Sequence, residues 1–144
     1  MNADFSLSGT NIGTVIVPAY TSKHSFNVSF SSIDEMIISD GLTVWPNGLL
    51  YMTHSIRKPV IFPESLTQIY GTITNQGEAD LTIVMKAKQP PVFMNLGKDG
   101  NSADPFYYAK AKIYVPNASV EAYKEADGWR LIADYIFPMR EYQP

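Results

Sequence analysis

Short runs of β-branched and aromatic residues recur along the chain at a nearly constant interval. Each run has the length and composition of one β-strand, and a proline or an Asp-Gly pair follows most of them. The central residues, separated by 21, 24, 22 and 31 positions, are Ile16, Ile37, Ile61, Ile83 and Tyr114. An interval in the low twenties is typical of a solenoid, in which each unit adds one strand to a growing sheet. Regularly spaced strands in a β-sandwich are the alternative.

Local patterns place the predicted strands. Alternation of apolar and polar residues is clearest in 25–30 and 80–86, where one face of the strand is apolar. Pro46-Asn47-Gly48 is a favourable turn sequence, so the runs on either side of it could form a hairpin. The predicted strands cover residues 14–18, 25–30, 34–39, 42–45, 49–52, 59–63, 65–70, 80–86 and 111–116.

The region 111–139 has the best-marked boundaries in the chain. Its strand ends at Pro116, and Ser119 stands at the N-cap position of a predicted helix. Gly128 can close that helix in a left-handed conformation. Two apolar stripes, on this helix and on a second helical turn that ends at Pro138, comprise Val120, Tyr123 and Ala126, then Trp129, Ile132, Ala133 and Ile136. We expect the helix to cover the open edge of the last strand.

Composition bounds the class of protein. The chain has 144 residues, 45% of them hydrophobic, which suits one globular domain with a substantial core. A net charge of -3 provides no general attraction for nucleic acid or for an anionic membrane surface. The absence of cysteine excludes disulfides, thiol chemistry and zinc-thiolate sites. We expect neither nucleic-acid binding nor membrane insertion, because the longest apolar runs are far shorter than a membrane span.

The C-terminal stretch resembles a known family. Region 111–139 is similar to the closing unit of BspA-like leucine-rich-repeat proteins, which are abundant in gut Bacteroidetes and their phages. The matching positions are Tyr114, Val115, Pro116, Ser119, Val120, Ala122, Tyr123, Lys124, Gly128, Trp129, Ile136 and Pro138. Pro90-Pro91 followed by Phe93 resembles the segment that precedes this unit, and PVIFPESLTQIYG resembles one repeat. The resemblance is weaker before residue 58, where the usual repeat positions are mostly absent.

The resemblance and the strand spacing together predict a fold. We expect a single, mostly-β domain over 1–144 with minor α+β character: a short leucine-rich-repeat-like solenoid or stacked β-sheet with a C-terminal capping helix. It divides into a divergent N-terminal β region (1–57), repeat-like strands and a loop (58–110), and a strand-helix closing unit (111–144).

Residues that could carry chemistry are few and scattered. His24 and His54 lack the converging partners that a metal site or a general base needs. The acidic pairs, Asp34-Glu35 and Glu78/Asp80, fit solvated strand flanks better than an acid–base pair. Loop 99–104 carries carboxylate and amide oxygens of the kind that bind calcium. It lacks the glycine and the bidentate glutamate of an EF-hand loop. We therefore predict no catalytic residues, no cofactor and no metal, and a small hydrolase is the weakest reading.

Tyrosines offer the candidate binding surface. Their flat, amphipathic rings could face a sugar or a protein, although tyrosines at strand ends are commonly just half-buried. The candidates are Tyr51, Tyr70, Tyr107 and Tyr108, with the terminal Tyr142 beside them.

These observations favour a non-enzymatic structural or recognition protein. The first residues lack the basic and apolar regions of a signal peptide, and the resembled family has phage members. We therefore expect a bacteriophage virion component made in the host cytoplasm, such as a capsid-decoration or fibre-associated protein. The alternative is an adhesion module at the bacterial cell surface. The expected partner is a virion or surface protein, or a surface glycan, and homo-oligomerisation is an option by analogy with virion proteins.

Overall fold

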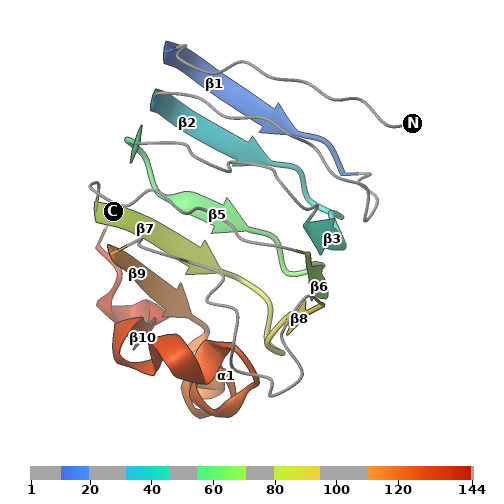
Figure 1. Cartoon of the computed structure of the whole chain (residues 1–144), viewed down its shortest axis with the longest axis vertical. Coiled ribbons are helices and arrows are strands. Elements are labelled where there is room, and N and C mark those ends of the chain that lie inside the picture. The colour runs from blue at the N-terminus through green and yellow to red at the C-terminus, as the bar shows by residue number, and fades with distance from the viewer. Residues whose placement is uncertain (1–10, 20–31, 46–54, 71–79, 95–109, 144) are drawn as a thin grey trace.

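Strands make up most of the structure. The computed structural model describes residues 11–19, 32–45, 55–70, 80–94 and 110–143 (Figure 1). Its strands are β1 (Asn11–Val17), β2 (Ser32–Ile38), β3 (Val44–Trp45), β4 (Ser55–Ile56), β5 (Val60–Phe62), β6 (Gln68–Ile69), β7 (Asp80–Met85), β8 (Val92–Phe93), β9 (Lys110–Val115) and β10 (Ile136–Pro138). Its helices are η1 (Asn117–Ser119), α1 (Val120–Glu125), η2 (Trp129–Tyr135) and η3 (Met139–Glu141), of which only α1 is an α-helix. The prediction of a mostly-β chain with minor helix is confirmed.

The strand positions follow the sequence pattern closely. Seven of the nine predicted strands overlap with an observed strand, from 14–18 with β1 to 111–116 with β9. The turn at Asp40-Gly41 is also present, and Gly41 adopts the left-handed backbone conformation that this residue tolerates, with φ of 94°. The predicted strands at 25–30 and 49–52, and the hairpin turn between 42–45 and 49–52, lie outside the described residues.

Every strand pairing among the described residues is parallel. One ladder runs β1-β2-β4, a second runs β10-β9-β7-β5, and a third, the short sheet, runs β3-β6-β8. The evenly spaced β-sandwich considered above is built from antiparallel strands. Parallel pairing instead requires a crossover between one strand and the next, so each pair is joined by a long stretch of chain.

The register shows which residues of successive units lie side by side. Ile16 pairs with Ile37 across β1 and β2, as their spacing predicts. Ile61 pairs with Val84, and Val84 with Tyr114, so the residue equivalent to Ile61 is Val84 and not the predicted Ile83. The interval between units varies by a few residues, so it could not distinguish Ile83 from its neighbour Val84, and the backbone pairing fixes the register.

A short irregular joint connects the first two ladders. β4 pairs with the start of β2, and the N–H groups of Arg57 and Lys58 donate to the consecutive carbonyls of Ile33 and Asp34, both at 3.0 Å. Pro59 follows and has no N–H to donate, so regular pairing is interrupted there. β5 nevertheless continues beside β2 (Figure 1). The strands β1, β2, β4/β5, β7, β9 and β10 are called the long sheet below.

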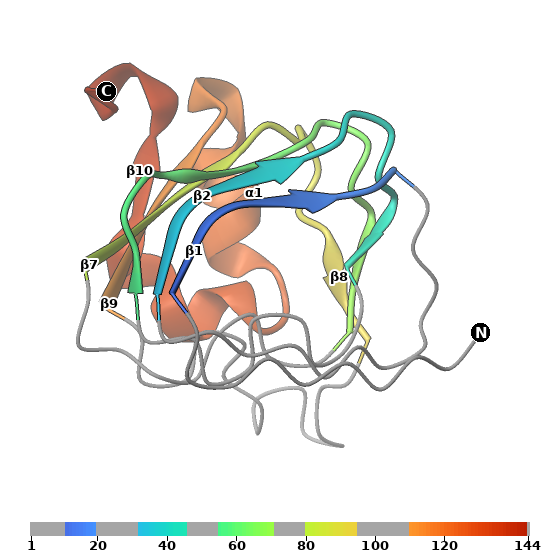
Figure 2. The ribbon, with the colours of Figure 1, turned by 90° about the horizontal axis from the view of Figure 1, so that it is seen from above.

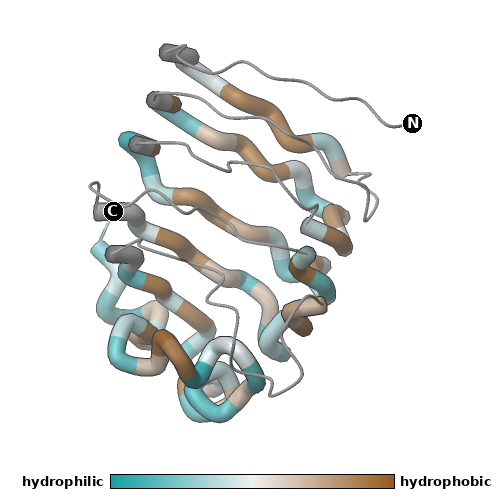
Figure 3. Tube along the Cα trace, viewed as in Figure 1, coloured by the Kyte–Doolittle hydropathy of each residue, from teal (hydrophilic) through white to brown (hydrophobic). Residues whose placement is uncertain are grey.

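The core lies between the long sheet and the short sheet. Trp45, Ile69 and Phe93 are neighbours along the short sheet and are all buried. The rings of Trp45 and Phe62, from the two sheets, meet edge-on at 4.9 Å. Viewed along the stack, the two sheets form adjoining sides of the molecule, and in hydropathy colours the middle of the long-sheet strands forms an apolar band (Figures 2 and 3).

The first part of the closing unit packs as predicted, apart from its cap. Tyr123 is fully buried, and Val120 and Ala126 pack against the core beside it. Gly128 has a positive φ of 81°, which glycine tolerates, but it does not close the helix as predicted: α1 ends at Glu125 with Ala126 as its C-cap, and Gly128 is the N-cap of η2. The Ser119 side chain, however, makes no N-cap hydrogen bond. Its hydroxyl donates to the carbonyl of Lys88 at 2.7 Å, so Ser119 fastens the helix to the preceding unit.

The second helical stripe is only partly helical. Trp129 and Ile132 are buried on η2, a 3-10 segment that is kinked at Ile132. Ile136, predicted to continue that stripe, belongs to β10, which pairs in parallel with β9. The free edge of β9 is therefore covered by a strand and not by the helix, because a strand can satisfy the backbone N–H and C=O groups of that edge directly.

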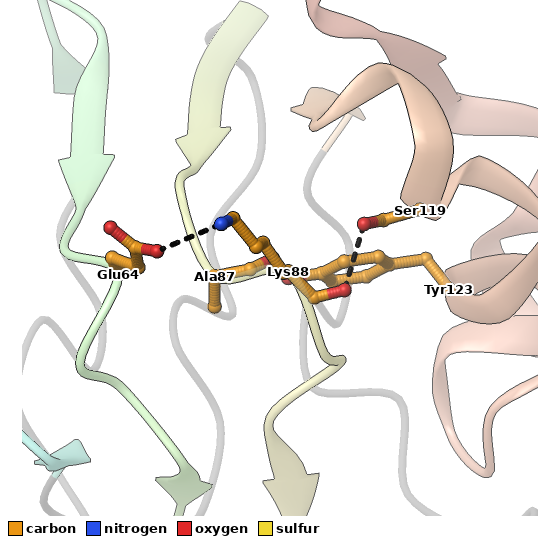
Figure 4. A network of polar contacts seen from close by, with 5 residues as sticks. All are labelled: Glu64, Ala87, Lys88, Ser119 and Tyr123. Atoms are coloured by element: carbon orange, nitrogen blue, oxygen red, sulfur yellow. Dashed lines mark hydrogen bonds and ion pairs between the residues drawn. The ribbon is translucent and has the colours of Figure 1, made fainter.

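Three side chains of the closing unit donate hydrogen bonds to one short segment between β7 and β8. Ser119 donates to Lys88 O as described, and the Tyr123 hydroxyl donates to Ala87 O at 2.7 Å (Figure 4). Trp129 Nε1 donates to Pro91 O at 2.9 Å. Pro90-Pro91 cannot donate to a ladder, so the chain leaves the sheet here with carbonyls to satisfy. The closing unit is thus held by directional polar contacts as well as by apolar packing.

None of the helices in the described part of the chain is both long and apolar enough to span a membrane.

Trp129 should behave as an anchor of the closing unit. Trp129→Ala removes a fully buried indole and its hydrogen bond, and we expect a loss of about 3–5 kcal/mol in the free energy of unfolding. Leu131→Ala, on the exposed side of η2, should cost less than about 0.5 kcal/mol. Urea unfolding followed by circular dichroism measures both. A cost below about 1 kcal/mol for Trp129→Ala would contradict this packing.

Tyr123 should make stability sensitive to alkaline pH. Burial raises the pKa of its hydroxyl well above the ordinary value of 10.0, because the charged form is disfavoured away from water. The unfolded chain therefore loses this proton first, and the free energy of unfolding should fall as the pH rises above about 10. Tyr123→Phe should weaken that decline, whereas Tyr135→Phe, at an exposed site, should not. Equal declines in the two variants, measured by urea unfolding across this pH range, would refute the assignment.

Candidate interaction surface

The outer face of the long sheet carries an exposed row of isoleucines. Ile16 and Ile37 stand near the carboxyl ends of β1 and β2, and Ile61 is the central residue of β5; they are 66%, 44% and 42% exposed. Their chain neighbours on the opposite face, including Val17, Ile38 and Phe62, are buried in the core. Side chains alternate between the two faces of a strand, so the core already takes one face of each strand and these isoleucines belong to the other. We call them the isoleucine row.

The same row continues toward the C-terminus but is covered there. Val84, the next residue along, is only 4% exposed. The Tyr114 ring then lies 5.9 Å from that of Phe137 and 5.2 Å from that of Tyr142, which follows η3. Tyr142 comes from the end of the described chain and packs onto the outer face of β9. The outer face is therefore closed over β7, β9 and β10, and open over β1, β2 and β5.

A groove of about 360 Å³ lies in the open part of this face. Ile37 and Ile61 line it together with Pro59 and Pro63 from either end of β5. The full lining comprises Glu35, Met36, Ile37, Ile38, Asp40, Pro59, Ile61, Pro63 and Lys86. The groove is therefore lined by aliphatic side chains and prolines together with three charged residues, Glu35, Asp40 and Lys86.

Most charged residues near the groove are already paired. Glu35 lies 3.4 Å from Lys58 Nζ, Asp34 lies 3.4 Å from Arg57 Nε, and Glu64 lies 3.7 Å from Lys88 Nζ. All three pairs are exposed and contribute little to stability. They link successive units along the sheet, since each joins residues more than twenty positions apart.

Asp40 and Lys86 differ from these pairs. Both are exposed, and neither makes an ion pair within the described residues. Asp40 follows the carboxyl end of β2, and Lys86 follows that of β7. β5 lies between those two strands, so an acid and a base stand at the same end of the groove on opposite sides of β5.

The predicted tyrosine surface is not assembled within the described residues. Tyr70 follows β6 and is half-buried, and its N–H donates to Trp45 O at 2.9 Å. Tyr51, Tyr107 and Tyr108 lie outside the described residues. Tyr142 is the one tyrosine of the original group that is seen to contact other aromatic rings.

The residues weighed for chemistry are mostly outside the described ranges. His24, His54 and loop 99–104 fall there. Asp34 and Glu35 are in β2, each facing its own basic partner in the next unit. Within the described ranges there is no group of three or more His, Asp or Glu residues that could hold a metal ion.

The sequence contained the signal for the isoleucine row, but only in part. The interval between strands aligned Ile16, Ile37 and Ile61. Because side chains alternate between the two faces along a strand, aligned residues in parallel strands lie on one common face. Which face is buried depends on the short sheet, whose two-residue strands have no periodicity to read. Cover over the C-terminal half of the row comes from Tyr142, a residue remote in sequence.

Comparison with known proteins adds no relatives: no protein-family model matches the chain, and no curated protein matches it. The fold and this surface are therefore the basis on which a function is proposed.

Neighbouring residues on β5 should differ sharply in their effect on stability. Ile61→Thr changes an exposed side chain, and we expect a shift within about 0.5 kcal/mol in the free energy of unfolding. Phe62→Ala empties a fully buried site against Trp45 and should cost about 3–5 kcal/mol. Chemical denaturation of the two variants tests which face is buried. Similar costs for both would place Ile61 in the core and remove the surface described here.

Proposed function

We propose that this protein is a non-enzymatic structural and recognition module, and that it serves as a component of a bacteriophage virion, as a capsid-decoration or fibre-associated protein. The observation that carries the proposal is the isoleucine row and its groove. Exposing aliphatic side chains to water on the outer face of the sheet is unfavourable in free energy. Burying them against the surface of a partner removes this unfavourable term. A charged border beside such a groove is the usual arrangement of a protein interface, apolar at its centre and polar at its rim.

We further propose that the chain is a short leucine-rich-repeat-like solenoid. In its favour, β2, β5 and β7 of the long sheet are each followed by one strand of the short sheet: β3, β6 and β8. The turns between them also repeat, since Leu42 N–H donates to Ser39 O and Leu66 N–H donates to Pro63 O. Ser65 Oγ donates to Leu42 O at 2.7 Å, as Ser119 Oγ donates to Lys88 O, so a serine links a turn to the unit before it in both places.

The chemistry of the groove favours a protein partner over a glycan. Its lining combines aliphatic, proline and charged residues and includes no aromatic ring onto which a sugar could stack. Catalysis needs titratable groups whose pKa values are tuned in a cleft. In the described residues the one resolved shift belongs to Tyr123, which is buried in the core against Ala87 O and away from the groove. These observations support recognition in preference to chemistry.

The alternative location is the bacterial cell surface, where the module would mediate adhesion. Both locations follow from the resemblance of 111–139 to the BspA-like closing unit, and both use the same kind of surface. They differ in which particle or membrane fraction contains the chain.

Fractionation separates the two locations. Phage particles purified on a density gradient from the strain that encodes the chain should contain its tryptic peptides, and the host outer-membrane fraction should not. The activity of a host cytoplasmic enzyme, measured in the same fractions, shows how much cytosol contaminates them. Peptides confined to the outer-membrane fraction would reject the virion and support the adhesion module. Peptides confined to the cytosol would reject both.

A further inference from the structure

We propose that the groove face is a self-association surface, on which a second copy of this chain packs face to face with a two-fold axis running along β5. The proposal deepens the function proposed above, because a virion component works among neighbouring copies. It nevertheless rests on its own observations: an open apolar row, and an unpaired acid and base on opposite sides of β5.

A two-fold axis along β5 reverses the order of the strands and preserves their direction. β2 of one copy then lies over β7 of the other, with the carboxyl ends of both strands at the same end of the interface. Asp40 beyond β2 faces the partner's Lys86 beyond β7, and symmetry generates the same pair a second time. Asp40 and Lys86, which make no ion pair among the described residues of one copy, thereby each meet an opposite charge in the other copy.

The apolar residues match under the same operation. Ile61 lies near the axis and meets its own copy, and Ile37 lies over the partner's β7, whose Val84 is only 4% exposed and adds little contact area. Ile16, the most exposed of the row, lies over the partner's β9, where Tyr114, Phe137 and Tyr142 form a half-buried aromatic cluster. Two sheets that pack face to face with strands in similar directions form an ordinary sandwich layer.

The perpendicular axis is disfavoured by charge. A two-fold axis across the strands would lay β2 over the partner's β2 in the opposite direction. Asp40, at the carboxyl end of β2, would then lie at the opposite end of the interface from the partner's Lys86, which follows the carboxyl end of β7. This arrangement leaves both charges without an opposite charge across the interface. Charge complementarity therefore selects the axis along β5.

Sedimentation velocity on the purified full chain over a wide concentration series tests the proposal. We expect a monomer–dimer equilibrium that weakens with added salt, because the paired charges lie at the rim. Asp40→Lys and Lys86→Asp should each weaken the dimer by about tenfold or more, since each substitution creates two like-charge contacts. Glu125→Lys, on the exposed side of α1, makes the same change in net charge as Asp40→Lys and should leave dimerisation unchanged.

The decisive measurement mixes the two charge variants. Asp40→Lys and Lys86→Asp chains, each weak alone, should form a heterodimer with restored affinity, and the double variant should restore the homodimer. Circular dichroism and thermal unfolding verify that each variant is folded. A chain that is monomeric at all concentrations overturns the proposal and leaves the groove to a different protein. Dimers that ignore the charge swaps, or that fail to recover on mixing, overturn it as well. The virion fractionation depends on none of these outcomes, so the two proposals can fail separately.

Discussion

The parallel backbone ladder is the constraint on which the rest of the structure depends. In the long sheet each strand satisfies the N–H and C=O groups of its neighbour, and the neighbour always comes from the adjacent unit of the chain. The apolar core of such a stack must be covered where the stack ends. β10 pairs with β9 and becomes the last strand of the sheet, and the buried Trp129 and Tyr123 cover the apolar end of the core. The closing unit therefore completes the stack at its C-terminal end.

That requirement explains why one segment receives so many side-chain hydrogen bonds. Between β7 and β8 the chain passes through Pro90-Pro91, which cannot take part in a ladder as donors. Ser119, Tyr123 and Trp129 supply hydrogen bonds to the carbonyls of this stretch. The segment around the diproline and the closing unit are thus joined by three side-chain hydrogen bonds.

Much of this fold could be predicted from sequence, because proline and β-branched residues act locally. The limits of β5 follow from Pro59 and Pro63, and the left-handed turn at Gly128 follows from its residue type. The predictions that were wrong concern residues whose position depends on contacts with segments distant in the sequence. Ile136 follows a helical stripe but is drawn into β10 by the free edge of β9, and Val84 replaces Ile83 in the row because only pairing reveals the register. The groove could not be predicted at all, since its openness depends on how far Tyr142 reaches across the outer face.

The two halves of the outer face differ in how far their apolar residues are covered, and this difference connects fold with function. Over β9 and β10 the chain covers its own outward apolar residues with Tyr142. Over β1, β2 and β5 comparable residues stay open, although a polar side chain at Ile16, Ile37 or Ile61 would cost the core nothing. Outward positions of a sheet are free of core packing, so an aliphatic residue repeated there in three successive units needs a reason outside the folded chain. Burial against another protein supplies that reason. The charges at the groove then decide orientation, because apolar contact alone does not distinguish one docking direction from another.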